Sequence, residues 1–482
     1  MDSDRRATAR IHLWSLSEDV LVEEGSAAGR TLVITKWAEV EIDEADDAVL
    51  ESLRRMTLGP VSLANALAHG DDDGTSHWTN VRRVLDMLSG SVVRSLALSD
   101  GERPLLSAVP VSRNAFLDLY EIGHDRPVRL SRFAAIRTSG TDLLVESPLA
   151  QYDIVLHRPL AMRVITGLAA PATIATLAAG LHAIPGAVAD LVGYLVAAGI
   201  VVTGDELEPG GKPSFAEDRD PILARWSHHE LLFHVRSRMG RYGGPSGAVF
   251  PHAERFPSPG LVKVVRTGDK VPLYRPDLSE LMLSDPPLTQ VLENARLCSD
   301  LTGRQLSAEQ VGELLYRAAR VRAIGSERAG SDVRYDVSDR PYLSTSGLYE
   351  LELYVCLHNC ADLPRGIFHY DPVEHALTMV NDSDRELDEL LDGARVAARI
   401  TTQPPMVITV TARIARASWM YAGIGYSLTL AHVGALQQTL SLVANAMGLA
   451  ACAPAIDPGD IVDNALRLDS PAEVGVGEFV VG

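Results

Sequence analysis

The segment from Arg340 to Val380, RPYLSTSGLYELELYVCLHNCADLPRGIFHYDPVEHALTMV, constrains the fold of this chain most strongly. Small polar residues at 344–347 form a turn, and the uninterrupted apolar run LELYVCL that follows has the length of a buried strand. The next stretch, GIFHYDPVEHAL, contains Asp371-Pro372, a dipeptide that favours a turn between two strands. The pattern therefore predicts a loop that leads into a pair of strands.

Length and charge bound the remaining possibilities. A chain of 482 residues is too long for one hydrophobic core, so we expect two or three domains. The net charge of −19, without a basic patch, argues against nucleic acid as a partner. The four cysteines lack CxxC spacing and lie in apolar surroundings, which indicates reduced thiols; they are Cys298, Cys356, Cys360 and Cys452.

Nothing in the sequence indicates a membrane segment. The N-terminus, MDSDRRATARIHLW, has no apolar run of signal-peptide length. Two apolar stretches, Ile184–Val202 and Tyr426–Ala451, carry polar residues that would be costly in a bilayer, so both are predicted to be buried helices. We therefore expect a cytoplasmic protein.

The first 205 residues contain the same order of predicted secondary-structure elements twice, at 10–100 and at 132–204. Each copy has a β-hairpin pattern, three short amphipathic helices and a closing strand, as a winged-helix-like module would. Acidic segments such as ADDAVLES and HGDDDG would repel phosphates, so a structural or peptide-binding role is favoured over nucleic-acid binding. A hairpin edge can hold an extended peptide by strand addition.

A Gly- and Pro-rich linker, GDELEPGGKPSFAEDRD, separates this repeat from the second half. The helix predicted at Trp226–Met239 contains His229, Glu230 and His234, which superficially suggest a zinc motif. Histidines five residues apart do not share a helix face, so no metal site is predicted. A GxSxG elbow and a Walker A loop are also absent from the sequence, which argues against hydrolases and nucleotide triphosphatases.

The second half alternates helices and strands. Ser307 and Gln310 form the pattern of a capping box, with Leu306 and Val311 placed as a hydrophobic staple. Further on, the sequence predicts a polar helix at 384–398, a buried strand at 405–414, a long helix within 417–452 and a terminal strand. This order indicates an α+β layered domain.

Four blocks of this half resemble the SagB-type (ThcOx-like) azoline dehydrogenases: RPYLSTSGLYELELY, GIFHYDPVEHAL, the segment 419–449 and the ending VGEFVVG. The resemblance covers Trp226 to the C-terminus and, more loosely, the repeat before it. It implies an α+β chain in which a nitroreductase-like FMN domain at 226–482 follows winged-helix-like modules at 1–105 and 106–205 and a linker at 206–225. It also implies a homodimer that oxidises thiazoline or oxazoline rings to thiazoles or oxazoles in a ribosomally made peptide.

That reaction removes a hydride and a proton from neighbouring ring carbons. FMN would take the hydride, because protein side chains offer no such electron sink. A base poised near neutral pH would take the proton. The family's Lys-Tyr base pair corresponds to Met420-Tyr421, so the resemblance leaves Tyr421 as the catalytic residue, with Met420 most simply explained by packing.

The resemblance also implies a set of FMN-binding positions. Cationic groups would hold the phosphate, and main-chain donors and side chains would hold the ring. The positions are Arg296, Arg340, Ser344, Thr345, Ser346, Gln437, Leu449 and Ala450. Three departures from the family pattern accompany them. Only Arg296 survives from the family's arginine-rich phosphate run, Thr345 and Ser346 replace the glycines of a Pro-Ser-Gly-Gly turn, and Cys452-Ala453-Pro454-Ala455 replaces a Gly-rich turn.

Three functions stay open on this evidence. The first is the FMN-dependent azoline dehydrogenase acting on a precursor peptide with its leader. The second is a flavin-deficient homologue that serves as partner or scaffold subunit of an azole-forming complex, in a heteromer with another dehydrogenase or a cyclodehydratase. The third is a general nitroreductase-type oxidoreductase. His432, on an otherwise apolar helix, is expected to be a hydrogen-bonded core histidine.

Overall fold

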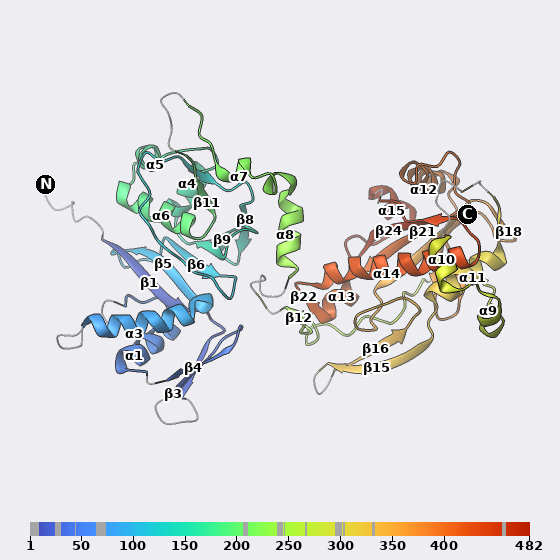
Figure 1. The fold of residues 1–482 in the computed structure, drawn as a ribbon, viewed down its shortest axis with the longest axis horizontal. Helices are drawn as coiled ribbons and strands as arrows, with labels where there is room; N and C mark the ends of the chain where they lie inside the picture. Colours follow the sequence, from blue (N-terminus) through green and yellow to red (C-terminus); the bar gives the residue numbers. More distant parts are fainter. Residues whose placement is uncertain are drawn as a thin grey trace. The chain divides into compact units, whose positions relative to one another are not determined.

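The computed structural model describes residues 9–24, 30–43, 45–63, 74–205, 211–238, 244, 246–265, 268–294, 301, 304–329, 333–455 and 459–482. The chain divides into two compact units, Met1–Gly243 and Gly244–Gly482 (Figure 1). The four-part division predicted from the sequence is finer than this and stays a prediction. No described helix is long and apolar enough to cross a membrane.

The N-terminal unit is built mainly from antiparallel strands and short helices. Its elements are β1 (Arg10–Leu16), β2 (Leu21–Glu24), β3 (Arg30–Ile34), β4 (Glu39–Asp43), α1 (Asp47–Leu58), α3 (Gly74–Met87), η1 (Ser89–Ser91), β5 (Val92–Leu98), β6 (Leu106–Pro110), β7 (Val128–Leu130), β8 (Ala135–Ser139), β9 (Asp142–Glu146), β10 (Tyr152–Leu156), α4 (Pro159–Gly167), α5 (Ile174–Leu181), α6 (Pro185–Ala197), β11 (Val201–Thr203), α7 (Ala216–Arg219), η2 (Leu223–Arg225) and α8 (His228–Arg236).

The element order repeats within this unit, but each copy has three strands where the sequence predicted a two-stranded hairpin. Each copy has a three-stranded meander (β2-β3-β4 and β8-β9-β10), then helices, then a closing strand. The closing strands β5 and β11 pair antiparallel with β1 and β7, which precede the two meanders. The middle helix expected in the first copy lies largely outside the described residues. The winged-helix assignment of the two copies stays a prediction.

The two copies share a sheet. A six-stranded sheet with the order β1-β5-β6-β10-β9-β8 contains strands of both copies. Separate hydrophobic cores lie under each copy, because the amphipathic helices bury their apolar faces locally. In the helix α8, Glu230 caps the N-terminus with Ser227, and His234 packs on Trp226 with ring centroids 5.6 Å apart. These residues of the apparent zinc motif therefore have structural roles.

The C-terminal unit is an α+β layer structure. Its elements are β12 (Gly247–Ala248), β13 (Lys270–Pro272), α9 (Leu278–Ser284), α10 (Leu288–Glu293), β14 (Leu306–Ser307), α11 (Ala308–Ala319), β15 (Ala323–Ala329), β16 (Val333–Asp339), β17 (Leu351–Leu357), β18 (Cys360–Ala361), β19 (Gly366–Asp371), β20 (Ala376–Asn381), α12 (Asp384–Ala397), β21 (Met406–Arg413), α13 (Ile414–Met420), β22 (Tyr421–Ala422), α14 (Gly425–Ala446), β23 (Ala451–Cys452), α15 (Asp460–Ala465) and β24 (Glu473–Val481).

A seven-stranded antiparallel sheet, β13-β20-β19-β17-β21-β24-β23, forms the middle layer (Figure 1). Every residue of β17 is buried. Its alternate residues Leu351, Leu353 and Val355 join the core under α11 and α14, whereas Tyr354 and Cys356 join the core under α12 and α15. Because both faces of β17 are covered, its sequence is a continuous apolar run rather than an alternation of apolar and polar residues.

Local predictions in this unit are confirmed. Strands β19 and β20 form the hairpin expected around Asp371, whose carboxylate accepts the N–H groups of Val373 and Glu374. Ser307 and Gln310 form the capping box of α11.

The expectation of four reduced thiols is wrong at Cys452, which is disulfide-bonded, because spacing along the sequence does not reveal spatial proximity. Cys356 and Cys360 are free, and Cys298 lies outside the described residues.

Candidate active site

The predicted cofactor turn, residues 343–346, connects β16 to the central strand β17. The Oγ atoms of Ser344 and Ser346 are buried and have no hydrogen-bond partner among the described residues, and the same holds for Nη2 of Arg340. Each buried polar group left unpaired costs about 1–3 kcal/mol. Three such groups between positions 340 and 346 therefore mark a place where a polar ligand would find ready partners.

Arg340 is fixed in position although one of its nitrogens is unpaired. Its Nε donates to Ser338 Oγ at 3.4 Å, and its guanidinium lies 5.0 Å from the ring centroid of Tyr349. Its main-chain N–H donates to the Tyr349 hydroxyl at 3.2 Å. Arg340 is buried, and a buried cation gains stability from an anionic partner. Its geometry thus suits a phosphate or carboxylate ligand.

His432 on α14 holds the turn from the other side. Its Nε2 accepts the main-chain N–H of Thr345 at 3.0 Å and lies 2.9 Å from Thr345 Oγ1, while Nδ1 lies 2.8 Å from Glu350 Oε1. A backbone N–H can only donate, so Nε2 is the acceptor and Nδ1 carries the proton that Glu350 accepts. His432 is therefore a hydrogen-bonded core histidine, and it occupies a main-chain donor of the predicted cofactor turn.

The partner of His432 is a buried carboxylate. Burial alone would raise the pKa of Glu350, but the hydrogen bond from His432, followed by one from Thr429, holds that pKa below its ordinary value. Glu350 is therefore ionised at neutral pH and orients the imidazole toward Thr345.

The other predicted cofactor positions are used within the fold. Gln437 donates from Nε2 to the main-chain oxygen of Glu478 at 3.1 Å and so ties α14 to β24. Leu449 and Ala450 are buried, and the main chain of Ala450 exchanges two hydrogen bonds with Gly482. Arg296 lies outside the described residues. The structure therefore brings Thr345 together with α14, and it shows Arg340, Ser344 and Ser346 with unsatisfied polar atoms.

Tyr421 lies at the junction of α13 and α14. It pairs with Ala248 across the short β12–β22 ladder and is half-buried in an aromatic cluster with Trp419 and Tyr335. Its hydroxyl has no hydrogen-bond partner in the part of the chain that the structure describes, so it is available to a ligand. The neighbouring Met420 is buried in the same cluster, as expected of a packing residue.

A second polar network, which the sequence did not predict, lies on the face of the central sheet that packs against α12 and α15, opposite to α14. Lys263 Nζ lies 2.5 Å from both Tyr354 Oη and Glu473 Oε2, and Thr411 Oγ1 donates to Glu473 Oε1 at 2.6 Å. Burial, followed by the charge of Glu473, raises the pKa of Tyr354. The members lie far apart in sequence, and Lys263 belongs to an irregular loop, so no local pattern indicated them.

Beside this network, Glu352 forms a buried charged cluster. It lies 2.9 Å from Nε2 of His369 and 2.8 Å from Nε of Arg413. Burial would raise the pKa of Glu352, but the hydrogen bond to His369 and the charges of Arg413 and Arg340 lower it. Glu352 alternates with Leu351 and Leu353 along β17, so this cluster lies on the same face of the sheet as Tyr354.

A triad-like set in the N-terminal unit does not support acyl transfer. Ser107 Oγ lies 2.9 Å from Nε2 of His157, whose Nδ1 lies 3.3 Å from Asp142. Burial lowers the pKa of His157, so the ring is neutral and carries one proton. Ser107 itself is buried in β6, and its Oγ also lies 2.7 Å from Ser95 Oγ. A substrate carbonyl therefore has no access to this hydroxyl.

Two family models match the chain. The model of the cyanobactin oxidase ThcOx matches residues 128–243, and that of the nitroreductase family matches residues 293–482. A nitroreductase-like protein of Methanocaldococcus jannaschii is 24% identical over 200 residues, which cover 42% of this chain and 89% of the relative.

Solved structures give weaker likenesses. A nitroreductase-like protein of Ralstonia eutropha has a TM-score of 0.35 at 22% identity, over 47% of this chain and 96% of its own. A chain of the Escherichia coli microcin synthetase McbBCD complex, with truncated pro-MccB17 bound, has a TM-score of 0.32 at 22% identity over 52% of this chain and 90% of that one. A nitroreductase-like protein of Desulfovibrio desulfuricans in complex with FMN has a TM-score of 0.26 at 18% identity, over 41% and 86%.

The assignment rests on the two family matches, which cover different parts of one chain. The second match coincides with most of the layered α+β unit, including the turn at 343–346 and the long helix α14. The chain therefore joins a segment similar to the cyanobactin oxidase ThcOx, at residues 128–243, to a C-terminal segment that matches the nitroreductase family, at residues 293–482.

Proposed function

We propose that the protein is an FMN-dependent dehydrogenase that oxidises thiazoline or oxazoline rings to thiazoles or oxazoles in a ribosomally made peptide. The observation that carries this proposal is the combination, in one chain, of a segment matching a cyanobactin oxidase and a segment matching the nitroreductase family. A general nitro- or quinone reductase would be supported by the second match alone.

The residues around the turn fit a bound FMN. Ser344 and Ser346 offer unpaired hydroxyls, and Arg340 offers an unpaired, buried guanidinium nitrogen for an anionic or carbonyl oxygen. When bound, FMN supplies the acceptor for the hydride that leaves the azoline ring. Tyr421 is the proposed proton-carrying residue, because it is half-buried beside the start of α14 and its hydroxyl has no partner among the described residues.

The substrate and partners follow from the same proposal. The substrate would be a precursor peptide with its leader, and the repeat in the N-terminal unit would supply the peptide-binding surface. Exposed apolar side chains on two short helices of the C-terminal unit support a subunit interface, in a homodimer or in a heteromer with another azole-forming subunit; they are Met282, Leu283, Leu288 and Leu292. A cytoplasmic location is part of the proposal.

Two observations favour a second candidate, a flavin-deficient partner or scaffold subunit. His432 already accepts the main-chain N–H of Thr345, which a flavin at this turn would otherwise use. Met420, in place of the family's lysine, is buried in a core and cannot take a proton. Both features are compatible with a chain that keeps the fold and has lost the reaction.

Flavin binding separates the two candidates. The purified protein should show the flavin absorbance band, or should take up added FMN with quenching of its fluorescence. Arg340→Gln should weaken FMN binding by about tenfold to hundredfold, because a hydrogen bond to a charged group is lost. Ser326→Ala, on the exposed strand β15, serves as the control and should bind as the unmodified protein does.

A colourless protein that takes up no FMN would refute the enzyme and leave the scaffold candidate. If FMN binds, Tyr421→Phe tests the proton step. We expect loss of azole formation with unchanged FMN affinity, and unchanged azole formation would remove Tyr421 from the mechanism.

A further inference from the structure

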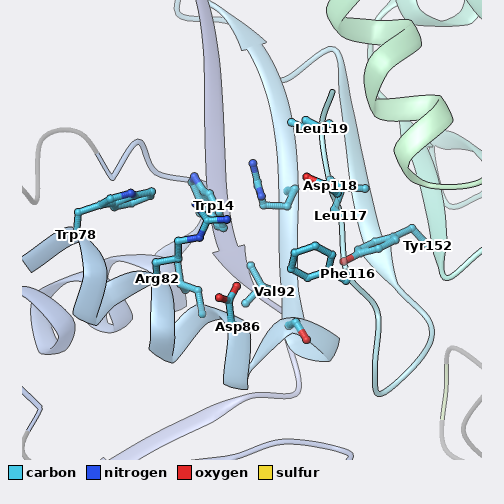
Figure 2. Close-up of a pocket in the computed structure, with 13 residues that line it drawn as sticks. Trp14, Trp78, Arg82, Asp86, Val92, Phe116, Leu117, Asp118, Leu119 and Tyr152 are labelled. Atoms are coloured by element: carbon cyan, nitrogen blue, oxygen red, sulfur yellow. The ribbon is translucent and has the colours of Figure 1, made fainter. Parts of the chain in front are cut away.

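A pocket of about 240 Å³ lies in the N-terminal unit, between the helix α3 and the six-stranded sheet (Figure 2). The sheet contributes Trp14, Arg94 and Tyr152, from β1, β5 and β10. Trp78 and Arg82 come from α3, and Phe116 from the loop after β6. Four aromatic rings and two guanidinium groups therefore surround one small cavity.

Arg94 is a partly buried cation of this pocket and forms no salt bridge with the residues that the structure describes. Its guanidinium stacks 3.4 Å from the ring centroid of Trp14, and its Nε is buried without a hydrogen-bond partner among those residues. Burial lowers the pKa of Arg94, and the groups that oppose this effect most are the phenols of Tyr194 and Tyr152 rather than a carboxylate. A cationic N–H that is buried without a partner is costly, so a ligand anion that accepts from Arg94 would relieve a cost that the fold already carries.

The walls select for a flat apolar group. Trp14 and Trp78 meet edge to face, with ring centroids 6.5 Å apart, and Phe116 remains more than half exposed at the pocket. An exposed phenylalanine in a pocket that two tryptophans also line gains burial when a flat apolar group enters. An aromatic ring of the ligand would therefore pack where Phe116 now contacts water.

Acidic residues at the pocket restrict the ligand's charge. Asp86 and Asp118 are exposed and line the same cavity. Two carboxylates here disfavour a dianion such as phosphate more than a monoanion, so a single carboxylate is the better partner for the guanidinium of Arg94. The donor fork of arginine also matches a carboxylate in bidentate geometry.

We propose that this pocket binds a carboxylate attached to a flat apolar group, with Arg94 as the anion partner and the aromatic walls holding the apolar part. The source is either a free aromatic acid or an acidic residue next to an aromatic one in a peptide, since both present the same chemistry. The proposal does not depend on flavin or on ring oxidation, so it can fail or hold separately from the proposed function.

The test uses the full-length chain and matched pairs of probes in titration calorimetry. Phenylacetate should bind, and the neutral phenylacetamide should bind at least about tenfold more weakly, because the charged hydrogen bond is lost. The peptide pair acetyl-Asp-Phe-amide and acetyl-Asn-Phe-amide should show the same preference if a peptide is the source. A preference for the carboxylate in only one pair identifies the source and supports the site.

Two variants place the binding in this pocket. Arg94→Gln should reduce carboxylate binding by about tenfold or more, and Phe116→Ala, an exposed position that leaves the cores intact, should weaken both carboxylate and amide probes. Arg83→Gln is the control, because Arg83 neighbours Arg82 on α3 and does not line the pocket. The proposal is overturned if neither carboxylate binds, if acids and amides bind equally, or if Phe116→Ala and Arg94→Gln bind like the unmodified protein.

Discussion

Replacing His432 with leucine should loosen the turn at 343–346 selectively. The change removes the acceptor of the Thr345 N–H and the contact to Thr345 Oγ1, at 3.0 and 2.9 Å. Each neutral hydrogen bond contributes about 0.5–1.5 kcal/mol, so about 1–3 kcal/mol of local stability is lost. Amide exchange over residues 340–349 should then accelerate by about fivefold to about 150-fold, as measured by hydrogen-exchange mass spectrometry.

The same variant should change the pH dependence of stability. In the unmodified protein the lowered pKa of Glu350 means that this carboxylate stabilises the fold above its ordinary pKa, and that the contribution is lost as the pH falls through the lowered value. Without His432, burial dominates and the pKa of Glu350 rises above its ordinary value. The buried carboxylate then destabilises the fold at neutral pH, and acidification relieves the cost. The stability difference between the two proteins should therefore narrow as the pH falls from 7 to about 4.

Gln438→Leu is the control, because Gln438 is exposed on the same helix and takes no part in the network. It should leave both the exchange of 340–349 and the pH profile unchanged. Unaltered exchange at 340–349 in His432→Leu, or a stability difference that does not depend on pH, would refute the role assigned to the Glu350–His432 pair.

Three further substitutions probe the framework. Lys263→Met leaves the buried carboxylate of Glu473 without its ion-pair partner. Chemical denaturation should show a loss of about 3 kcal/mol in the free energy of unfolding, and the added change Glu473→Gln should largely restore it. An equally stable single variant would contradict the ion pair. Ser307→Ala should destabilise α11 by about 1 kcal/mol, because the N-cap hydrogen bond is lost, and amide hydrogen exchange in the first turn of the helix should become faster. Unchanged exchange in that turn would contradict the capping box. Gly347→Ala should lower the stability seen in thermal unfolding by about 1 kcal/mol or more, because φ at this position is +68° and the new Cβ would lie 3.3 Å from the main-chain oxygen of Ser338. An unchanged Tm would contradict that strain.

Local sequence signals predicted much of the fold correctly. The apolar run at 351–357 became the buried central strand, Asp371-Pro372 marked the hairpin between β19 and β20, and Ser307 with Gln310 capped α11. These features depend on residues within a few positions of one another, and such short-range chemistry is fixed before the chain folds. The repeat was visible for the same reason, since each copy has its own periodic pattern.

The candidate site was only partly predictable. The resemblance placed the cofactor turn at 343–346, but the sequence could not show that Thr345 is held by His432, because 87 residues separate them. Likewise Gln437 was expected at the cofactor, whereas the fold places its amide against the main chain of β24. The partner of a polar side chain is decided by which elements pack together, and no local pattern encodes that.

By itself, the sequence determined the layered α+β class, the doubled N-terminal plan and the position of the turn, because periodicity and capping act over short distances. Only the tertiary structure decided which polar groups are paired. It joined Lys263 to Glu473 across 210 residues and stacked Arg94 on Trp14. It also left hydroxyls of the turn and Nε of Arg94 without a partner among the described residues. Burial and long-range proximity set the electrostatics of these groups, and both exist only once the chain is folded.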